Sequence, residues 1–113
     1  MAIDGDALVD FTRRLVQIPS VYDPARGLDE QPAADLVIEQ MRAFGWEPEV
    51  DVVAPGRPNV VATIDGGSPG PTLMFEGHLD VVTEGDLAEW THDPFGAELS
   101  DGRIWGRGAA DMK

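Results

Sequence analysis

The chain contains the stretch Phe75-Glu76-Gly77-His78-Leu79-Asp80, which ends an apolar run that begins at Thr72. We expect a β-strand over residues 72–76. Side chains two residues apart share one face of a strand, so His78 and Asp80 would point the same way. An imidazole beside a carboxylate suits a metal ligand whose second ring nitrogen donates to that carboxylate. The pair predicts a metal site, although His-x-Asp pairs also occur as ordinary exposed loop residues.

The residues before this stretch predict two helices. Apolar side chains recur at spacings of three and four over residues 8–18, with Asp4 or Asp6 available as the N-cap and Pro19 ending the pattern. A second helix is expected over residues 32–45, which begin with a proline and end with a glycine. Both helices precede most of the extended sequence.

Short apolar runs bounded by Gly and Pro predict several strands. They lie near residues 46–52, 59–64, 72–76 and 103–105. Pro48 would place the first of them at a sheet edge or delay its start. Two helices followed by several strands indicate an α/β fold whose sheet is begun within these residues.

The net charge limits the partners of the protein. Eight Lys and Arg residues against 21 Asp and Glu residues give the 113-residue chain a net charge of −13. Nucleic acids and anionic membrane surfaces attract basic protein surfaces, so both are disfavoured as partners. No apolar run approaches the roughly 18 residues of a membrane span, and residues 1–4 lack a basic leader. We therefore expect a cytoplasmic protein.

The same composition restricts the chemistry of any metal site. The chain has no Cys, so a site must use His and carboxylate ligands. Residues 58–102 contain nine carboxylates and no Lys or Arg, which suits a cation. The alternative is that most of these acidic residues only solvate loops.

A second informative stretch is Asp101-Gly102-Arg103-Ile104-Trp105-Gly106-Arg107-Gly108-Ala109-Ala110-Asp111-Met112-Lys113. Its Gly-Arg-Gly run does not fit a dinucleotide-binding loop, because Asp111 stands where that pattern needs Gly or Ala and would repel a pyrophosphate. We expect Arg107 to pair with a carboxylate and so hold the glycine turn. His92, upstream of this stretch, is expected to be an exposed loop residue.

Five motifs in order along the chain resemble one family of enzymes. They occupy residues 15–21, 56–62, 77–82, 90–95 and 101–113. The sequence resembles the zinc metallopeptidase and deacylase family that includes acetylornithine deacetylase, succinyl-diaminopimelate desuccinylase, aminoacylase and glutamate carboxypeptidase. The resemblance implies part of a three-layer α/β/α catalytic domain that is incomplete at the C-terminus. Residues 1–113 would form the N-terminal part of that domain, and the lid and dimerisation domain would be absent.

The resemblance also implies roles for individual residues. His78 resembles the imidazole ligand of one zinc ion, and Asp111 resembles the carboxylate that bridges two zinc ions. Asp80 resembles the catalytic carboxylate that orients the imidazole and tunes the metal. In related proteins the peptide bond after the bridging Asp is often cis, which here is the bond from Asp111 to Met112. The implied cofactor is Zn²⁺, two ions per complete active site, with Co²⁺ as a substitute.

The implied activity is the metal-dependent hydrolysis of amide bonds in N-acyl amino acids or small peptides. The general-base Glu, the remaining ligands and a distal His would lie after Lys113, so this chain alone is expected to be inactive. The complete protein is expected to act on small molecules and to form a homodimer. The alternative is a noncatalytic acidic module that binds a cation or a protein partner.

Overall fold

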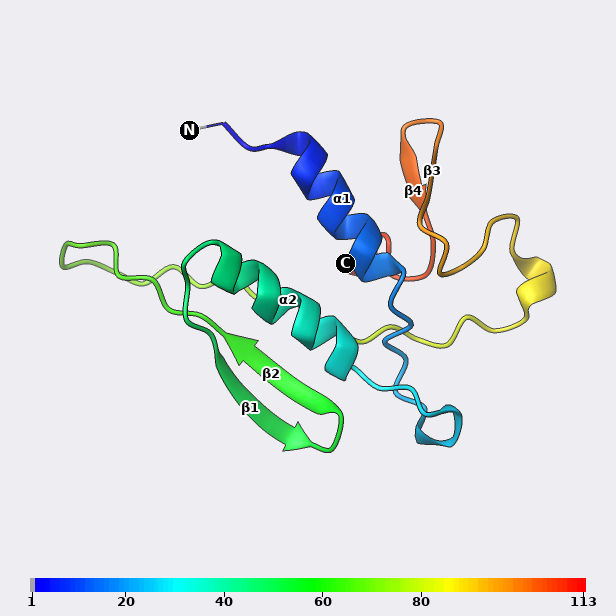
Figure 1. The fold of residues 1–113 in the computed structure, drawn as a ribbon, viewed down its shortest axis with the longest axis horizontal. Helices are drawn as coiled ribbons and strands as arrows, with labels where there is room; N and C mark the ends of the chain where they lie inside the picture. Colours follow the sequence, from blue (N-terminus) through cyan, green and yellow to red (C-terminus); the bar gives the residue numbers. More distant parts are fainter. Residues whose placement is uncertain (1) are drawn as a thin grey trace.

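The computed structural model describes residues 2–113, which form helices, short 3-10 helices and β-hairpins (Figure 1). The elements in order are α1 (Gly5–Val16), η1 (Pro24–Arg26), α2 (Gln31–Ala43), β1 (Glu49–Ala54), β2 (Arg57–Val61), η2 (Leu87–Glu89), β3 (Glu98–Ser100) and β4 (Arg103–Trp105). This mixture of helix and strand confirms the expected α/β class. Among residues 2–113 the strands form two separate two-stranded antiparallel sheets.

Helix α1 begins after one of the two predicted caps and ends before Pro19, two residues short of the predicted apolar pattern. The Asp4 side chain accepts a hydrogen bond of 3.0 Å from the Ala7 backbone N–H and caps the first turn. The helix ends at Val16, three residues before Pro19. Its last turn carries Leu15 and Val16 into the core, with exposed fractions of 8% and 0%. The C-terminal end of α1 is therefore the part that the rest of the chain packs against.

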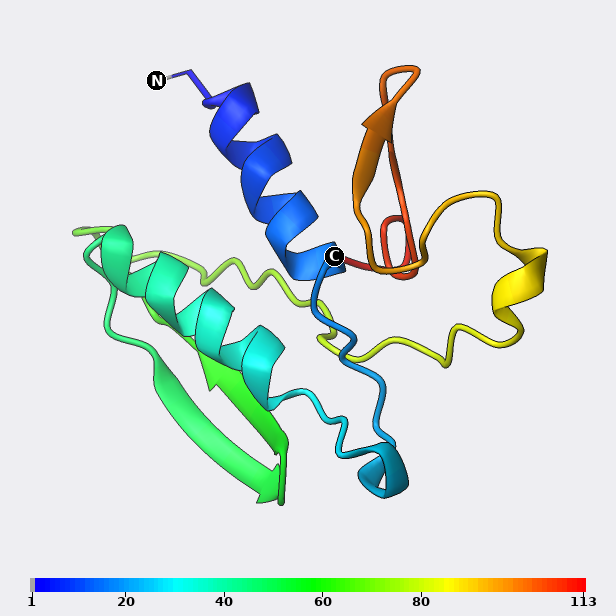
Figure 2. The ribbon, with the colours of Figure 1, turned by 45° about the vertical axis from the view of Figure 1, so that its right-hand side comes forward.

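Helix α2 packs on the hairpin of β1 and β2, as both ribbon views show (Figures 1 and 2). Ala33, Ala34 and Leu36 provide its buried side. As predicted, a proline lies in its first turn, and Gly45 follows its end with a positive φ of 80°. Strand β1 begins at Glu49, so Pro48 delays its start as expected.

The second hairpin turns through two residues in the left-handed region. Asp101 and Gly102 have φ values of 53° and 69° and join β3 to β4. Positive φ at both central residues is typical of the type I′ turn, which matches the twist of paired strands and favours Asp-Gly. Strand β4 was predicted, whereas its partner β3 was not.

The strand predicted over residues 72–76 is wrong. These residues form no ladder, and Leu73, Met74 and Phe75 have exposed fractions of 77%, 74% and 88%. A strand needs a neighbouring chain for its backbone hydrogen bonds, and no segment within residues 2–113 pairs with this run. His78 and Asp80 therefore do not share the face of a strand.

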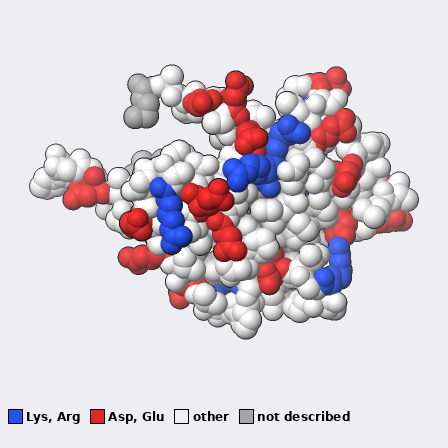
Figure 3. All heavy atoms as spheres, viewed as in Figure 1, with Lys and Arg blue, Asp and Glu red and all other residues white. Residues whose placement is uncertain are grey.

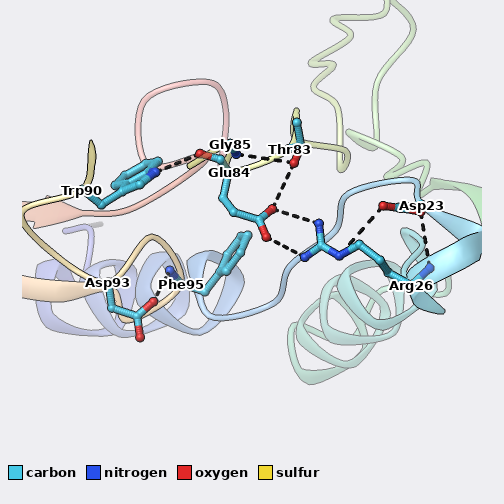
Figure 4. A network of polar contacts seen from close by, with 8 residues as sticks. All are labelled: Asp23, Arg26, Thr83, Glu84, Gly85, Trp90, Asp93 and Phe95. Carbon is cyan, nitrogen blue, oxygen red and sulfur yellow. Dashed lines mark hydrogen bonds and ion pairs between the residues drawn. The ribbon is translucent and has the colours of Figure 1, made fainter. Parts of the chain in front are cut away.

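The loop after residue 80 is held to η1 by an ion pair (Figure 4). Both terminal nitrogens of Arg26 donate to the Glu84 carboxylate, with Nη1 at 3.2 Å from Oε2. Arg26 lowers the pKa of Glu84 to about 2. The Glu84 carbonyl in turn accepts a hydrogen bond of 2.8 Å from Trp90 Nε1. These contacts tie the 83–90 loop to the segment between α1 and α2.

Acidic side chains are spread over several elements on the face drawn in Figure 3, with Lys and Arg side chains lying between them. They do not gather into a single patch on that face. No helix within residues 2–113 is long and apolar enough to cross a membrane.

Candidate functional site

The structure brings His78 and Asp111 into direct contact. His78 Nε2 lies 2.8 Å from Asp111 Oδ1, although the two residues are 33 positions apart. On the other side of the ring, Nδ1 lies 2.9 Å from the Asp80 backbone carbonyl oxygen. The Asp80 carboxylate is farther away, with Oδ1 at 3.4 Å from Nδ1. The three residues named from the sequence thus lie together, with the Asp80 carbonyl as the closest partner of Nδ1.

The two partners define which ring nitrogen is available to a metal. A carbonyl oxygen can only accept, so His78 Nδ1 carries a proton and donates it to Asp80. Nε2 lies at hydrogen-bond distance from the Asp111 carboxylate, so a proton on this nitrogen would be donated to Asp111. Without a metal, the pKa of His78 lies above its usual value, because Asp111 and then the Asp80 carbonyl accept hydrogen bonds from the ring.

The chemistry of these donors fits zinc. Imidazole nitrogen and carboxylate oxygen are both common zinc ligands, and a backbone carbonyl on the opposite ring nitrogen is a usual way to fix a metal-binding imidazole. The side chains of His78 and Asp111 are 46% and 87% exposed, so an ion can reach both. Residues 2–113 contain no group of three or more possible ligand side chains. They therefore supply two donors.

Gly77 and Met112 make close contact beside this pair. A Cβ atom at Gly77 would lie 2.9 Å from Met112 Cε, so the glycine leaves room for the methionine. The peptide bond between Asp111 and Met112 is cis, as the resemblance implied. The segments that carry His78 and Asp111 are therefore in contact at Gly77 and Met112 as well as at the two candidate ligands.

An open groove of about 940 Å³ runs past His78. Its lining is mainly apolar and includes Met41 of α2, Val60 of β2 and Phe75. His78 and Asp80 lie on its wall. His78 thus borders a space large enough for a small molecule.

A second polar pair, Glu30 and Arg57, lines this groove and was not predicted from the sequence. Glu30 is 5% exposed and accepts a hydrogen bond of 2.9 Å from Arg57 Nε, and Arg57 Nη2 forms an ion pair with Glu30 Oε1 at 2.8 Å. The Arg57 guanidinium also lies 4.5 Å from the centre of the Tyr22 ring, a cation–π contact. The pKa of Arg57 is raised, chiefly by its hydrogen bonds to Glu30. Arg57 lies in the motif at residues 56–62 that carried the family resemblance. This motif was the feature of the sequence that could have drawn attention to the pair.

Two expectations from the sequence are corrected. His92 is not an exposed loop residue: its ring stacks on Trp105 with centres 4.3 Å apart, and Nδ1 donates to Glu98 Oε2 at 2.8 Å. Arg107 has no carboxylate partner within residues 2–113, and its guanidinium lies 5.1 Å from the centre of the Trp90 ring. An aromatic face replaced the expected ion pair because the loop places Trp90, rather than an acidic residue, beside the guanidinium.

Comparison with known proteins identifies relatives over the whole chain. The model of peptidase family M20/M25/M40 matches residues 74–113, which include both candidate ligands. A succinyl-diaminopimelate desuccinylase from Rhodospirillum centenum is 64% identical over 100% of this chain and 28% of its own length. Proteins of the same name from Methylobacterium radiotolerans and Cereibacter sphaeroides are 44% and 43% identical, over 96% and 100% of this chain.

The chain spans about a quarter of the length of the curated relatives it matches, 26% for the Methylobacterium radiotolerans protein. The family match begins just before the His78 stretch and includes the whole second stretch that the sequence singled out. Residues 74–113 are thus similar to peptidase family M20/M25/M40, and a relative that covers the whole chain extends the similarity to the motifs upstream of them.

Proposed function

We propose that the protein is a metal-dependent hydrolase of amide bonds in N-acyl amino acids or small peptides, of the deacylase or carboxypeptidase type. The observation that carries the proposal is the position of His78, whose Nδ1 donates to a carbonyl while Nε2 faces the Asp111 carboxylate 2.8 Å away. The relatives named succinyl-diaminopimelate desuccinylase make removal of a succinyl group from an amino-acid amine the first reaction to assay.

His78 Nε2 and the Asp111 carboxylate would hold zinc, and the second oxygen of Asp111 would remain for a second ion, with Co²⁺ as a substitute metal. Bound zinc lowers the pKa of a water molecule toward neutrality and polarises a carbonyl oxygen. Asp80 orients the imidazole through its backbone carbonyl, and its carboxylate, 3.4 Å from Nδ1, stabilises positive charge on the ring. The apolar groove beside the pair would bind the carbon chain of the substrate.

The remaining groups of the reaction would come from outside this sequence. A catalytic zinc site uses three protein ligands and an open position, and residues 2–113 offer two donors. We place residues 1–113 in the N-terminal part of the catalytic domain, with the general base, the other ligands and the lid and dimerisation domain elsewhere in the longer protein. The chain covers 26% of the length of a relative, so most of that relative has no counterpart in this sequence.

The partners that we propose are small molecules. The net charge of −13 opposes binding to nucleic acid and to anionic membranes. The proposal includes a cytoplasmic location and a homodimer for the complete protein.

The test is an assay of the purified full-length protein with N-succinyl and N-acetyl amino acids, before and after chelation of metal. We expect activity to disappear on chelation and to return with Zn²⁺ or Co²⁺. His78→Ala should lower zinc occupancy and turnover, whereas His92→Ala, which removes an imidazole that stacks on Trp105, should keep both. Full activity after chelation, or greater sensitivity to the His92 change, would refute the proposal.

A further inference from the structure

We propose that the chain just after α1, residues 17–20, together with the end of α1, positions both halves of the candidate metal pair, with Ser20 and Lys113 as the positioning residues. This inference rests on the proposed function, because it concerns how the pair is kept ready for a metal. It assigns a task to two polar side chains that do not themselves reach the pair.

Ser20 fixes the segment that carries His78 and Asp80. Its side chain is fully buried, and Oγ donates a hydrogen bond of 2.6 Å to the Leu79 carbonyl. The Ser20 carbonyl accepts a hydrogen bond of 3.0 Å from the Val81 backbone N–H. The two bonds lie on either side of Asp80. Because no strand ladder holds this segment within residues 2–113, these bonds take the place of strand pairing.

Lys113 fixes the segment that carries Asp111. Its ammonium group donates to the Leu15 and Ile18 carbonyls at 2.8 and 2.6 Å. Carbonyls at the end of a helix carry partial negative charge, so a cation there is favourable. The Lys113 backbone N–H also donates to the Gly108 carbonyl at 2.8 Å, which closes the loop around Asp111.

The two anchored segments also touch each other. Gly108 has a φ of 88°, and a Cβ atom there would lie 2.7 Å from Val81 Cγ1. The ribbon views place the C-terminus at the end of α1 (Figures 1 and 2). One short stretch, residues 15–20, thus bonds to both sides of the pair. The His78–Asp111 distance is set by this shared support, and a shift of either segment would separate the ligands.

A purely structural role predicts a different outcome, and the chain offers a matched control. Arg13, also on α1, donates from Nε to the Ala97 carbonyl at 2.9 Å. Like the bonds of Lys113, this bond joins a long cationic side chain to a distant backbone carbonyl. Its acceptor, however, lies in the loop before β3 and not in a segment that carries a candidate ligand. Arg13→Met should therefore lower stability without moving the candidate ligands.

The experiment compares Ser20→Ala, Lys113→Met and Arg13→Met in the full-length protein. Zinc affinity is measured by competition with a chromophoric chelator, the visible spectrum of bound Co²⁺ reports ligand geometry, and thermal unfolding reports stability. We expect the first two variants to bind zinc more weakly, by on the order of 10- to 100-fold as for other residues that orient metal ligands, with an altered Co²⁺ spectrum. Arg13→Met should keep wild-type affinity and spectrum, and Lys113→Arg should restore part of the affinity.

Wild-type affinity and spectrum in both Ser20→Ala and Lys113→Met would overturn the inference, as would equal losses in Arg13→Met. If Lys113→Met does not fold, the same measurements on Ser20→Ala and Lys113→Arg test the inference. Wild-type zinc affinity and Co²⁺ spectrum in both of these variants would then overturn it. His78→Ala separates this inference from the proposed function. Zinc affinity that is unchanged by His78→Ala overturns both, whereas affinity that depends on His78 but not on Ser20 or Lys113 overturns the inference alone.

Discussion

The His78 imidazole is held between an acceptor two residues ahead and an acceptor 33 residues ahead in the chain. Nδ1 donates to the Asp80 carbonyl at 2.9 Å, and Nε2 lies 2.8 Å from Asp111 Oδ1. The short-range contact fixes the ring, and under the proposed function the residue of the long-range contact would provide the second donor atom for a metal. This division of tasks suggests which substitutions should affect metal binding and which should affect turnover.

Asp80→Asn should retain most of the metal and lose activity. The backbone carbonyl that orients His78 survives the substitution, whereas the negative charge 3.4 Å from Nδ1 is removed. Because such partners tune the basicity of the ligand, we expect turnover to fall on the order of 10- to 100-fold. Metal analysis and steady-state kinetics on the full-length variant provide the measurement. Loss of the metal together with the activity would contradict the assigned role.

Glu84→Gln should change the acid stability of the protein. Arg26 lowers the pKa of Glu84 to about 2, below its usual value of 4.5. The unfolded state therefore binds more protons between these two values, so the stabilisation is complete above pH 4.5 and is lost as the pH falls toward 2. Wild type should be more stable than Glu84→Gln at pH 7, and the difference should vanish near pH 2.

Denaturant titrations at several pH values measure this difference. Arg26→Met should reproduce the pH dependence of Glu84→Gln, and the double variant should add little, because both substitutions remove the same ion pair. A difference between wild type and Glu84→Gln that stays constant from pH 7 to pH 2 would contradict the assignment.

Gly106→Ala should destabilise the fold. A Cβ atom at this position would lie 2.5 Å from Val16 Cγ1 and 2.9 Å from the Pro94 carbonyl oxygen. Val16 is fully buried, so the neighbours have little room to move. We expect a loss of about 1–3 kcal/mol in the free energy of unfolding. Gly66→Ala is the matched control, since nothing lies within 4 Å of its added methyl group. Equal effects in the two variants would contradict the packing argument.

The 113-residue chain on its own should hydrolyse no N-acyl amino acid and should bind zinc weakly, because two donors do not complete a zinc site. The apolar residues 73–75 have exposed fractions of 74–88%, so they should also promote association between copies of the chain. Calorimetric zinc titration and light scattering measure both properties. Tight binding of two zinc ions with turnover would contradict the account.

The helices could be predicted because their determinants are local. The N-cap at Asp4, the apolar spacing of α1 and the glycine after α2 all act within a few residues of the elements they define. The run at residues 72–76 has the composition of a strand, but a strand also needs a partner, and sequence composition does not say whether one is near. That prediction failed for this reason.

The candidate site was only partly accessible from local pattern. His78 and Asp80 stand two residues apart, whereas Asp111 was joined to them by family resemblance, since no local pattern relates residues 33 positions apart. The bonds from Lys113 to the end of α1 span 95 and 98 positions and had no signal in the sequence. The contact of Arg107 with Trp90 likewise depends on a loop conformation that pattern does not encode.

The central claim is that His78 and Asp111 bind a metal together. Anomalous diffraction at the zinc absorption edge, from crystals of the zinc-loaded full-length protein, tests it most directly. We expect a zinc peak about 2.0–2.2 Å from both His78 Nε2 and an Asp111 carboxylate oxygen. A zinc ion bound at another place, with His78 Nε2 still hydrogen-bonded to Asp111, would contradict joint binding of the metal by these two residues.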